Sequence, residues 1–161
     1  MVQAGANIGV LILSQLYSEA IFFLYIASYT KPILQMVEKQ KFELEYIIRT
    51  SPKVLYTRLS SADGLAQWFA DDVNINDGIF TFIWEGAGQE AKKIKEKAGK
   101  FIRFHWLDDD DDCYFEFRLE IDEITSEVAL IITDFAEEDE IDESKQLWDS
   151  QVNSLMQLLG S

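Results

Sequence analysis

The sequence contains one cysteine, Cys113, and one histidine, His105. These counts exclude a disulfide within the chain and a zinc site built from a cluster of His and Cys. Basic residues are also scarce: 14 Lys and Arg stand against 29 Asp and Glu, which gives a net charge of −15. Because binding to phosphate backbones and anionic lipid surfaces depends mainly on Lys and Arg, we expect no nucleic-acid partner and no membrane-surface partner. A single cysteine is consistent with a reducing cytoplasm.

Apolar residues are plentiful by contrast. Of the 161 residues, 48% are hydrophobic and 13% are aromatic. A chain of this length forms one domain that buries roughly two thirds of its unfolded surface. The composition therefore predicts a globular protein whose core holds many large flat side chains.

The first 35 residues differ in character from the rest. Residues 8–28 are almost entirely apolar and match the length of a membrane span, but polar residues including Glu19 interrupt them. We interpret residues 1–35 as an apolar N-terminal extension, non-native or unpacked, and residues 36–161 as the globular domain. The alternatives are an additional packed helix and a membrane anchor. Because Lys31, Lys39 and Lys41 follow the apolar run, an anchor would leave the domain in the cytoplasm.

The C-terminal stretch from Glu143 to Leu159 has the clearest periodicity. Apolar residues recur there at steps of three and four, which places them on one face of a helix; they are Trp148, Val152, Leu155, Met156 and Leu159. Acidic residues precede the stretch, where the helix dipole favours negative charge, and Gly160 follows it at the usual place of a left-handed cap. A helix with one apolar face must be covered by another layer.

The residues after Lys41 predict a strand and two short helices. Apolar residues alternate with polar ones from Phe42 to Ile48, as in a half-buried strand. Ser51 and Pro52 are typical of an N-cap and a first helical position. We expect the buried side of this helix to consist of Val54, Leu55 and Leu59. A second short helix is predicted from the spacing of Leu65, Trp68 and Phe69.

The middle of the chain predicts further antiparallel strands. Alternating apolar residues define strands around 79–84, 101–106, 115–121 and 128–132. Gly86 and Gly88 indicate a hairpin turn, and the charged run 89–97 is expected to be an exposed or edge strand. A meander with one apolar face that helices must cover is an α+β arrangement. We therefore predict a curved antiparallel β-sheet wrapped around a long C-terminal α-helix, with two short helices after the first strand.

Several motifs in this order resemble those of the START-like superfamily, also called helix-grip or SRPBCC. Within it, the chain is similar to homologues of the activator of a heat-shock chaperone ATPase. The resemblance covers about residues 41–159 and rests on Ser51 to Leu59, Leu65 to Phe69, Phe80-x-Phe82-x-Trp84, Ile102-x-Phe104-x-Trp106, Val128-x-Leu130 and Trp148.

The resemblance implies an apolar ligand cavity between the sheet and the terminal helix. We expect its lining to come from the inward faces of the elements, namely Phe80, Phe82, Trp84, Phe104, Trp106, Phe117, Leu119, Leu130, Trp148, Val152 and Met156. The alternative is that so many large side chains fill the space completely, because protein interiors pack to crystal density.

No stretch of the sequence indicates a reaction, a cofactor or a metal. His105 is expected to point outward, the acidic neighbours of Cys113 disfavour its thiolate, and Asp108 to Asp112 lacks the spacing of a calcium loop. We predict a non-enzymatic cytoplasmic domain that binds an apolar small molecule or lipid, with a chaperone or another protein with a basic surface as a further partner. The alternative is a cyclase-like or hydrolase-like enzyme with an apolar substrate. It would require a cavity-facing carboxylate or histidine, for which Glu85, Glu90, Glu116 and His105 are the candidates.

Overall fold

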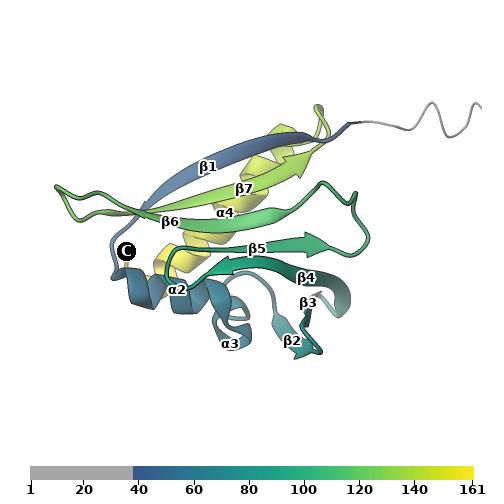
Figure 1. Cartoon of the computed structure of the whole chain (residues 1–161), viewed down its shortest axis with the longest axis horizontal. Helices are drawn as coiled ribbons and strands as arrows, with labels where there is room; N and C mark the ends of the chain where they lie inside the picture. Colours follow the sequence, from purple (N-terminus) through teal and green to yellow (C-terminus); the bar gives the residue numbers. More distant parts are fainter. Residues whose placement is uncertain (1–37) are drawn as a thin grey trace, which may run out of the picture. The chain divides into compact units, whose positions relative to one another are not determined.

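The structure, a computed structural model, describes residues 38–161, and our interpretation of residues 1–35 lies outside that range. Within the described residues, seven antiparallel strands form one sheet in the order β1-β7-β6-β5-β4-β3-β2 (Figure 1). The strands are β1 (Gln40–Ile48), β2 (Asp72–Asn76), β3 (Ile79–Trp84), β4 (Ala87–Lys97), β5 (Phe101–Trp106), β6 (Phe115–Ile121) and β7 (Val128–Ala136). The expected antiparallel sheet is therefore confirmed.

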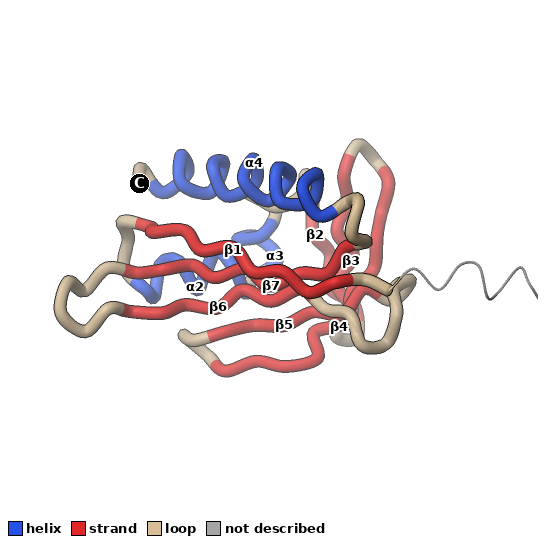
Figure 2. The backbone as a smooth tube through the Cα atoms, turned by 90° about the horizontal axis from the view of Figure 1, so that it is seen from above, coloured by secondary structure: helices blue, strands red, loops and turns tan. Residues whose placement is uncertain are grey.

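The long C-terminal helix, α4 (Ile141–Leu159), lies along one face of the sheet (Figure 2). Trp148, Val152 and Leu155 are buried against the core. Gly160 caps the helix in the left-handed conformation, at a φ of 67°. The predicted helix, its apolar face and its C-cap are confirmed, and together with the sheet they form the helix-grip arrangement.

Two short helices follow β1, as the sequence predicts. The Ser51 hydroxyl caps α2 (Pro52–Ser60) by accepting a hydrogen bond from the Val54 backbone N–H at 3.3 Å. The expected burial of Val54 is wrong: its side chain is 44% exposed because it lies on the solvent face of the helix. The second helix, α3 (Ala62–Leu65), is shorter and begins earlier than the spacing suggested.

Trp68 and Phe69 follow α3 in a turn and are both buried. Their spacing of three and four from Leu65 therefore reflects a common buried face, not a continuous helix. The chain leaves the helical conformation after α3, and the Phe69 carbonyl oxygen accepts hydrogen bonds from side chains of other elements.

Strand β2 was missed in the sequence because only one of its residues, Val73, is buried. A signal was present: Asp77-Gly78 separates β2 from β3, and this dipeptide favours a tight hairpin turn. Both residues have the positive φ that such a turn requires, 48° and 82°. The next hairpin uses Glu85-Gly86 in the same way, so Gly88 lies within β4 and not in the turn.

The charged strand β4 is exposed as expected, but it is not an edge strand. It lies between β3 and β5, and its pairing with β3 ends at Lys92. Lys95, Glu96 and Lys97 continue to pair with β5 beyond a bulge. The second half of β4 thus has β5 on one side only, which explains why its sequence looks like that of an edge.

Candidate functional site

Most of the residues expected to line a cavity lie in a closed core. All eleven belong to the core cluster or pack directly against it. Eight of them do not line the pocket described below; they are Phe80, Phe82, Phe104, Phe117, Leu119, Leu130, Val152 and Met156. Their rings contact one another closely, as in the Phe80–Phe104 pair, whose centroids are 5.0 Å apart. Large rings at the middle of the strands fill the space beneath α4.

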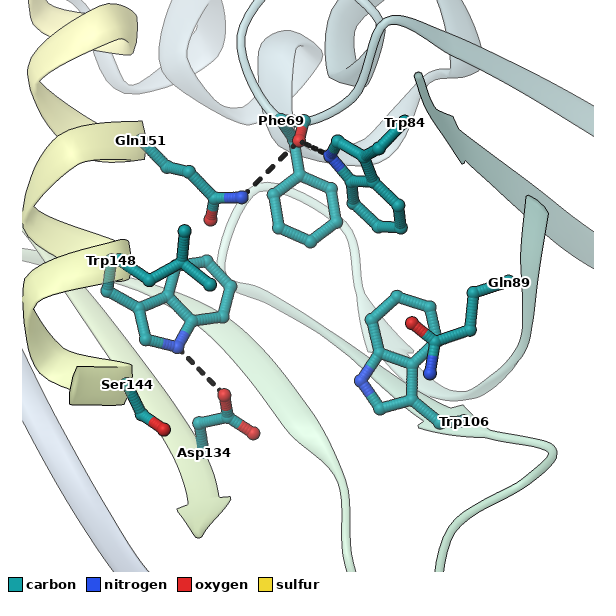
Figure 3. Close-up of a pocket in the computed structure, with 9 residues that line it drawn as sticks. Phe69, Trp84, Gln89, Trp106, Asp134, Ser144, Trp148 and Gln151 are labelled. Atoms are coloured by element: carbon teal, nitrogen blue, oxygen red, sulfur yellow. Dashed lines mark hydrogen bonds between the residues drawn. The ribbon is translucent and has the colours of Figure 1, made fainter. Parts of the chain in front are cut away.

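A pocket of about 390 Å³ lies at one end of this core (Figure 3). Three of the expected residues, Trp84, Trp106 and Trp148, do line it. Among residues 38–161 its lining, most of which the sequence interpretation missed, is Phe69, Trp84, Gln89, Trp106, Asp134, Ser144, Leu147, Trp148 and Gln151.

The fold brings these residues together at strand ends and along one helix face. Trp84 and Trp106 are the last residues of β3 and β5. On α4, the lining residues 144, 147, 148 and 151 recur at steps of three and four, so they face the same side. Ser144 and Gln151 are polar, so the apolar periodicity of the helix does not include them.

Phe69 fixes the aromatic wall of the pocket. Its ring stacks on Trp148 with centroids 5.5 Å apart and meets Trp84 edge to face at 5.6 Å. Its backbone carbonyl accepts a hydrogen bond from Trp84 Nε1 at 2.8 Å and a longer one from Gln151 Nε2 at 3.5 Å. Figure 3 shows the Phe69 ring between Trp148 and Trp84. The three rings therefore hold one another in place.

Asp134 places a carboxylate in the wall of the pocket. One oxygen accepts a hydrogen bond from Trp148 Nε1 at 2.8 Å, and the other accepts one from the Phe135 backbone N–H, also at 2.8 Å. Burial raises the pKa of Asp134 to about 6, and the neighbouring Asp109 charge acts in the same direction. The two hydrogen bonds and the more distant Lys39 ammonium only partly oppose this rise in pKa.

The sequence did contain a signal for Asp134. Val128, Leu130 and Ile132 alternate on the inward face of β7, and the same two-residue period places Asp134 on that face. An acidic residue at an inward position is unusual and indicates a functional candidate. Ending the predicted strand at residue 132 hid it.

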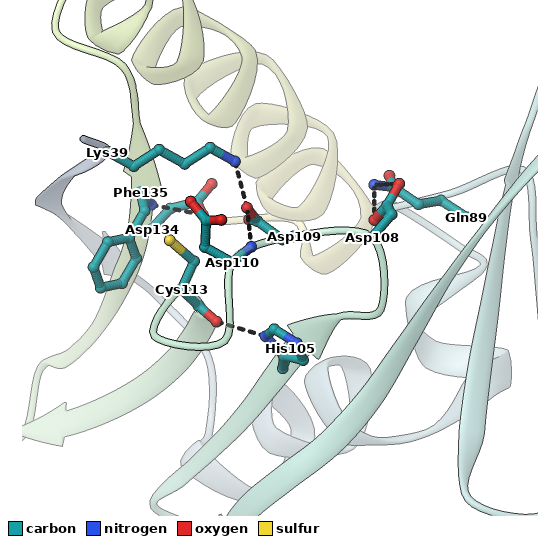
Figure 4. A network of polar contacts seen from close by, with 9 residues as sticks. All are labelled: Lys39, Gln89, His105, Asp108, Asp109, Asp110, Cys113, Asp134 and Phe135. Atoms are coloured by element: carbon teal, nitrogen blue, oxygen red, sulfur yellow. Dashed lines mark hydrogen bonds and ion pairs between the residues drawn. The ribbon is translucent and has the colours of Figure 1, made fainter. Parts of the chain in front are cut away.

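A second, more polar hollow of about 240 Å³ adjoins the pocket and shares Gln89, Trp106 and Asp134 with it. Asp108 and Asp109 line this hollow, and Asp108 accepts hydrogen bonds from Gln89 Nε2 at 3.2 and 3.3 Å (Figure 4). The ammonium of Lys39 pairs with the Asp109 carboxylate at 2.5 Å. The pocket is thus bordered by carboxylates on one side.

The residues considered for catalysis from sequence do not face the pocket. His105 Nδ1 lies 2.8 Å from the Cys113 carbonyl oxygen (Figure 4), while Glu85 and Glu90 are exposed. Glu116 is buried at 6% exposure, but it pairs with Arg103 Nε at 2.8 Å on the opposite face of the sheet.

Cys113 lies in the loop between β5 and β6. Burial and the neighbouring acidic groups raise the pKa of its thiol, so the thiolate is disfavoured. Within residues 38–161, ligand atoms of Asp109, Asp110 and Cys113 lie within 4.8 Å of one another. Because Lys39 already neutralises Asp109 and the thiol favours its protonated form, we assign no metal to this group.

Comparisons with known proteins agree with this architecture. A family model described as a START-like superfamily domain matches residues 36–161. The solution structure of BfR322 from Bacteroides fragilis is 43% identical, covers 75% of this chain and 91% of that protein, and has a TM-score of 0.56. The Aha1 dimer from Colwellia psychrerythraea is 21% identical, with 74% and 96% coverage and a TM-score of 0.64.

A third solved structure, protein MLL2253 from Mesorhizobium loti, is 16% identical, with 75% and 97% coverage and a TM-score of 0.62. A search among curated proteins gave no match. Among residues 38–161, no helix has the length and hydropathy that a membrane crossing requires; the apolar run 8–28 lies outside that range. The matched family and the observed fold lead to one conclusion: the chain belongs to the START-like superfamily.

Proposed function

We propose that this protein binds a small apolar molecule, without chemical change, in the pocket between α4 and the ends of β3 and β5. One observation carries the proposal: four aromatic side chains, Phe69, Trp84, Trp106 and Trp148, line a space of about 390 Å³. Pockets of this size with mainly apolar walls are typical of small-molecule sites. The volume lies near the lower end of that range and favours a compact molecule over a lipid with two acyl chains.

The rigidity of the wall also supports binding. Phe69, Trp84 and Trp148 are fixed by stacking and by hydrogen bonds between elements that are distant in sequence. A ligand therefore has few side chains to order on entry, which lowers the entropic cost of association. Burial of its apolar surface supplies the driving force.

A second candidate function is catalysis, because Asp134 meets the requirement for a carboxylate in the cavity. A carboxyl group with a pKa near 6 exchanges its proton readily close to neutral pH. The described lining residues add one hydroxyl, that of Ser144, but no histidine, cysteine or lysine to activate it. We therefore favour binding over turnover, and an Asp134→Asn variant that binds a candidate substrate but no longer converts it would reverse this preference.

We propose in addition that the protein has a protein partner with a basic surface and that it lies in the cytoplasm. The first is supported by the net charge of −15 and the second by the single cysteine. The similarity to Aha1, at 21% identity, supports the fold and not a chaperone partner.

Filling the pocket from α4 tests the proposed function. Gln151 points toward Phe69, so a Gln151→Trp variant places an indole ring in the pocket. We expect this variant to bind the neutral dye N-phenyl-1-naphthylamine at least tenfold more weakly than the wild type does, as measured by dye fluorescence.

Asn153→Trp is the matched control, because residue 153 is exposed on the same helix and does not line the pocket. We expect this variant to bind the dye as the wild type does. Equal dye binding by Gln151→Trp and the wild type would show that the dye binds elsewhere and would count against the proposed site.

A further inference from the structure

The pocket combines electron-rich rings with a carboxylate, and this combination selects a class of ligand. We propose that the ligand is a small organic cation, an ammonium group carried on an apolar body, held between the tryptophan rings and Asp134. The inference rests on the proposed function, because it names the chemistry of the molecule bound at the same site.

Trp84 and Trp148 can contact a ligand mainly through the faces of their rings. Trp84 Nε1 donates to the Phe69 carbonyl and Trp148 Nε1 donates to Asp134, each at 2.8 Å. With these two N–H groups occupied, the remaining interaction of both rings is through their π systems. Tryptophan is the aromatic side chain that attracts cations most strongly, and the attraction increases where water is excluded.

Asp134 is a carboxylate that lacks a close cation. Its two hydrogen bonds come from neutral donors, the Trp148 indole and the Phe135 backbone. Within residues 38–161 Asp134 forms no ion pair, and Lys39, the basic side chain whose charge acts on it, pairs with Asp109 instead. The pKa of Asp134, near 6, agrees with a buried carboxylate that has no cation beside it, since an ion pair would lower the pKa below the ordinary value.

The surrounding charges favour a cation as well. None of the lining residues that the structure describes is basic. The adjoining hollow adds Asp108 and Asp109, and Lys39 is the one basic side chain among its described lining residues. An anionic ligand, such as a fatty acid, would face the carboxylates of Asp134 and Asp108, while Asp109 is paired with Lys39. A cation would be attracted by the same groups, and steering by the net charge of −15 would add to this attraction.

A pair of isosteric probes tests the inference. Phenyltrimethylammonium and tert-butylbenzene have the same shape and differ in one positive charge. Burial of apolar surface alone favours the neutral compound, because the cation loses more hydration. We expect the wild-type protein to bind the cation at least tenfold more tightly than the neutral isostere, as measured by titration with NMR detection.

Two variants identify the carboxylate responsible. Asp134→Asn is expected to lower the affinity for the cation at least tenfold and to leave that for tert-butylbenzene unchanged. Asp111→Asn, which removes the same charge from an exposed position outside the pocket, is expected to change neither affinity.

The possible failures are distinguishable. If tert-butylbenzene binds as tightly as the cation, and Asp134→Asn affects neither, the cation inference is wrong while the apolar pocket stands. If neither probe binds to the wild type, both the inference and the proposed function are overturned.

Discussion

Replacing Trp148 with alanine is expected to lower the free energy of unfolding by about 4 kcal/mol, the usual cost of removing a large buried aromatic side chain. Trp148 is 6% exposed, stacks on Phe69 at 5.5 Å and meets Phe117 edge to face at 5.8 Å. The substitution would also remove the indole N–H that Asp134 accepts. Chemical denaturation followed by circular dichroism measures the change.

Two further variants separate packing from general effects of substitution on α4. Trp148→Phe keeps much of the ring but loses the N–H, so we expect about half of the loss seen with alanine. Leu147→Ala changes the adjacent residue, which is 61% exposed, and is expected to alter stability by less than about 0.5 kcal/mol. A Trp148→Ala variant as stable as Leu147→Ala would show that this residue does not hold α4 on the sheet.

Replacing Asp134 with asparagine is expected to remove a pH-dependent loss of stability. The pKa of this carboxyl is raised from 3.8 to about 6 in the folded state, so the folded protein binds the proton more tightly than the unfolded chain does. The stability contributed by Asp134 is therefore greatest at acid pH and is lost as the pH rises toward 6. Asparagine does not ionise and avoids this loss. Its single side-chain oxygen can accept only one of the two hydrogen bonds, a cost that does not change with pH.

The measurement is the difference in unfolding free energy between Asp134→Asn and the wild type, followed from pH 4.5 to pH 8. We expect the difference to grow in favour of the variant by about 2 kcal/mol across this range, given the cost per pKa unit. Asp111→Asn controls for the general effect of removing one negative charge and should give a nearly constant difference. A constant difference for Asp134→Asn as well would contradict the burial of the carboxylate.

The sequence predicted the fold better than the site. Alternation and helical spacing identify which residues face inward, and most of the strands, the N-cap at Ser51 and the C-cap at Gly160 follow from local chemistry. Val54 and strand β2 show the limit of these signals. At these positions exposure depends on the neighbouring elements, and local pattern does not report it.

The pocket was harder to predict because it depends on which inward residues meet one another. Phe82 and Trp84 share one face of β3, yet Phe82 is fully buried by other rings while Trp84, at the strand end, borders open space. Phe69 reaches the pocket from a turn, and Gln151 reaches it from a polar position on α4. Only the three-dimensional path of the chain brings these residues together.

The most direct test uses the four tryptophan side chains as internal reporters. Trp84, Trp106 and Trp148 line the pocket, whereas Trp68 does not and donates its indole N–H to the Arg58 carbonyl at 3.0 Å. In a two-dimensional ¹H–¹⁵N NMR titration with N-phenyl-1-naphthylamine, we expect the indole N–H signals of the three pocket residues to shift with one common dissociation constant and that of Trp68 to stay in place. No saturable shift, or a shift confined to Trp68, would contradict ligand binding at this pocket.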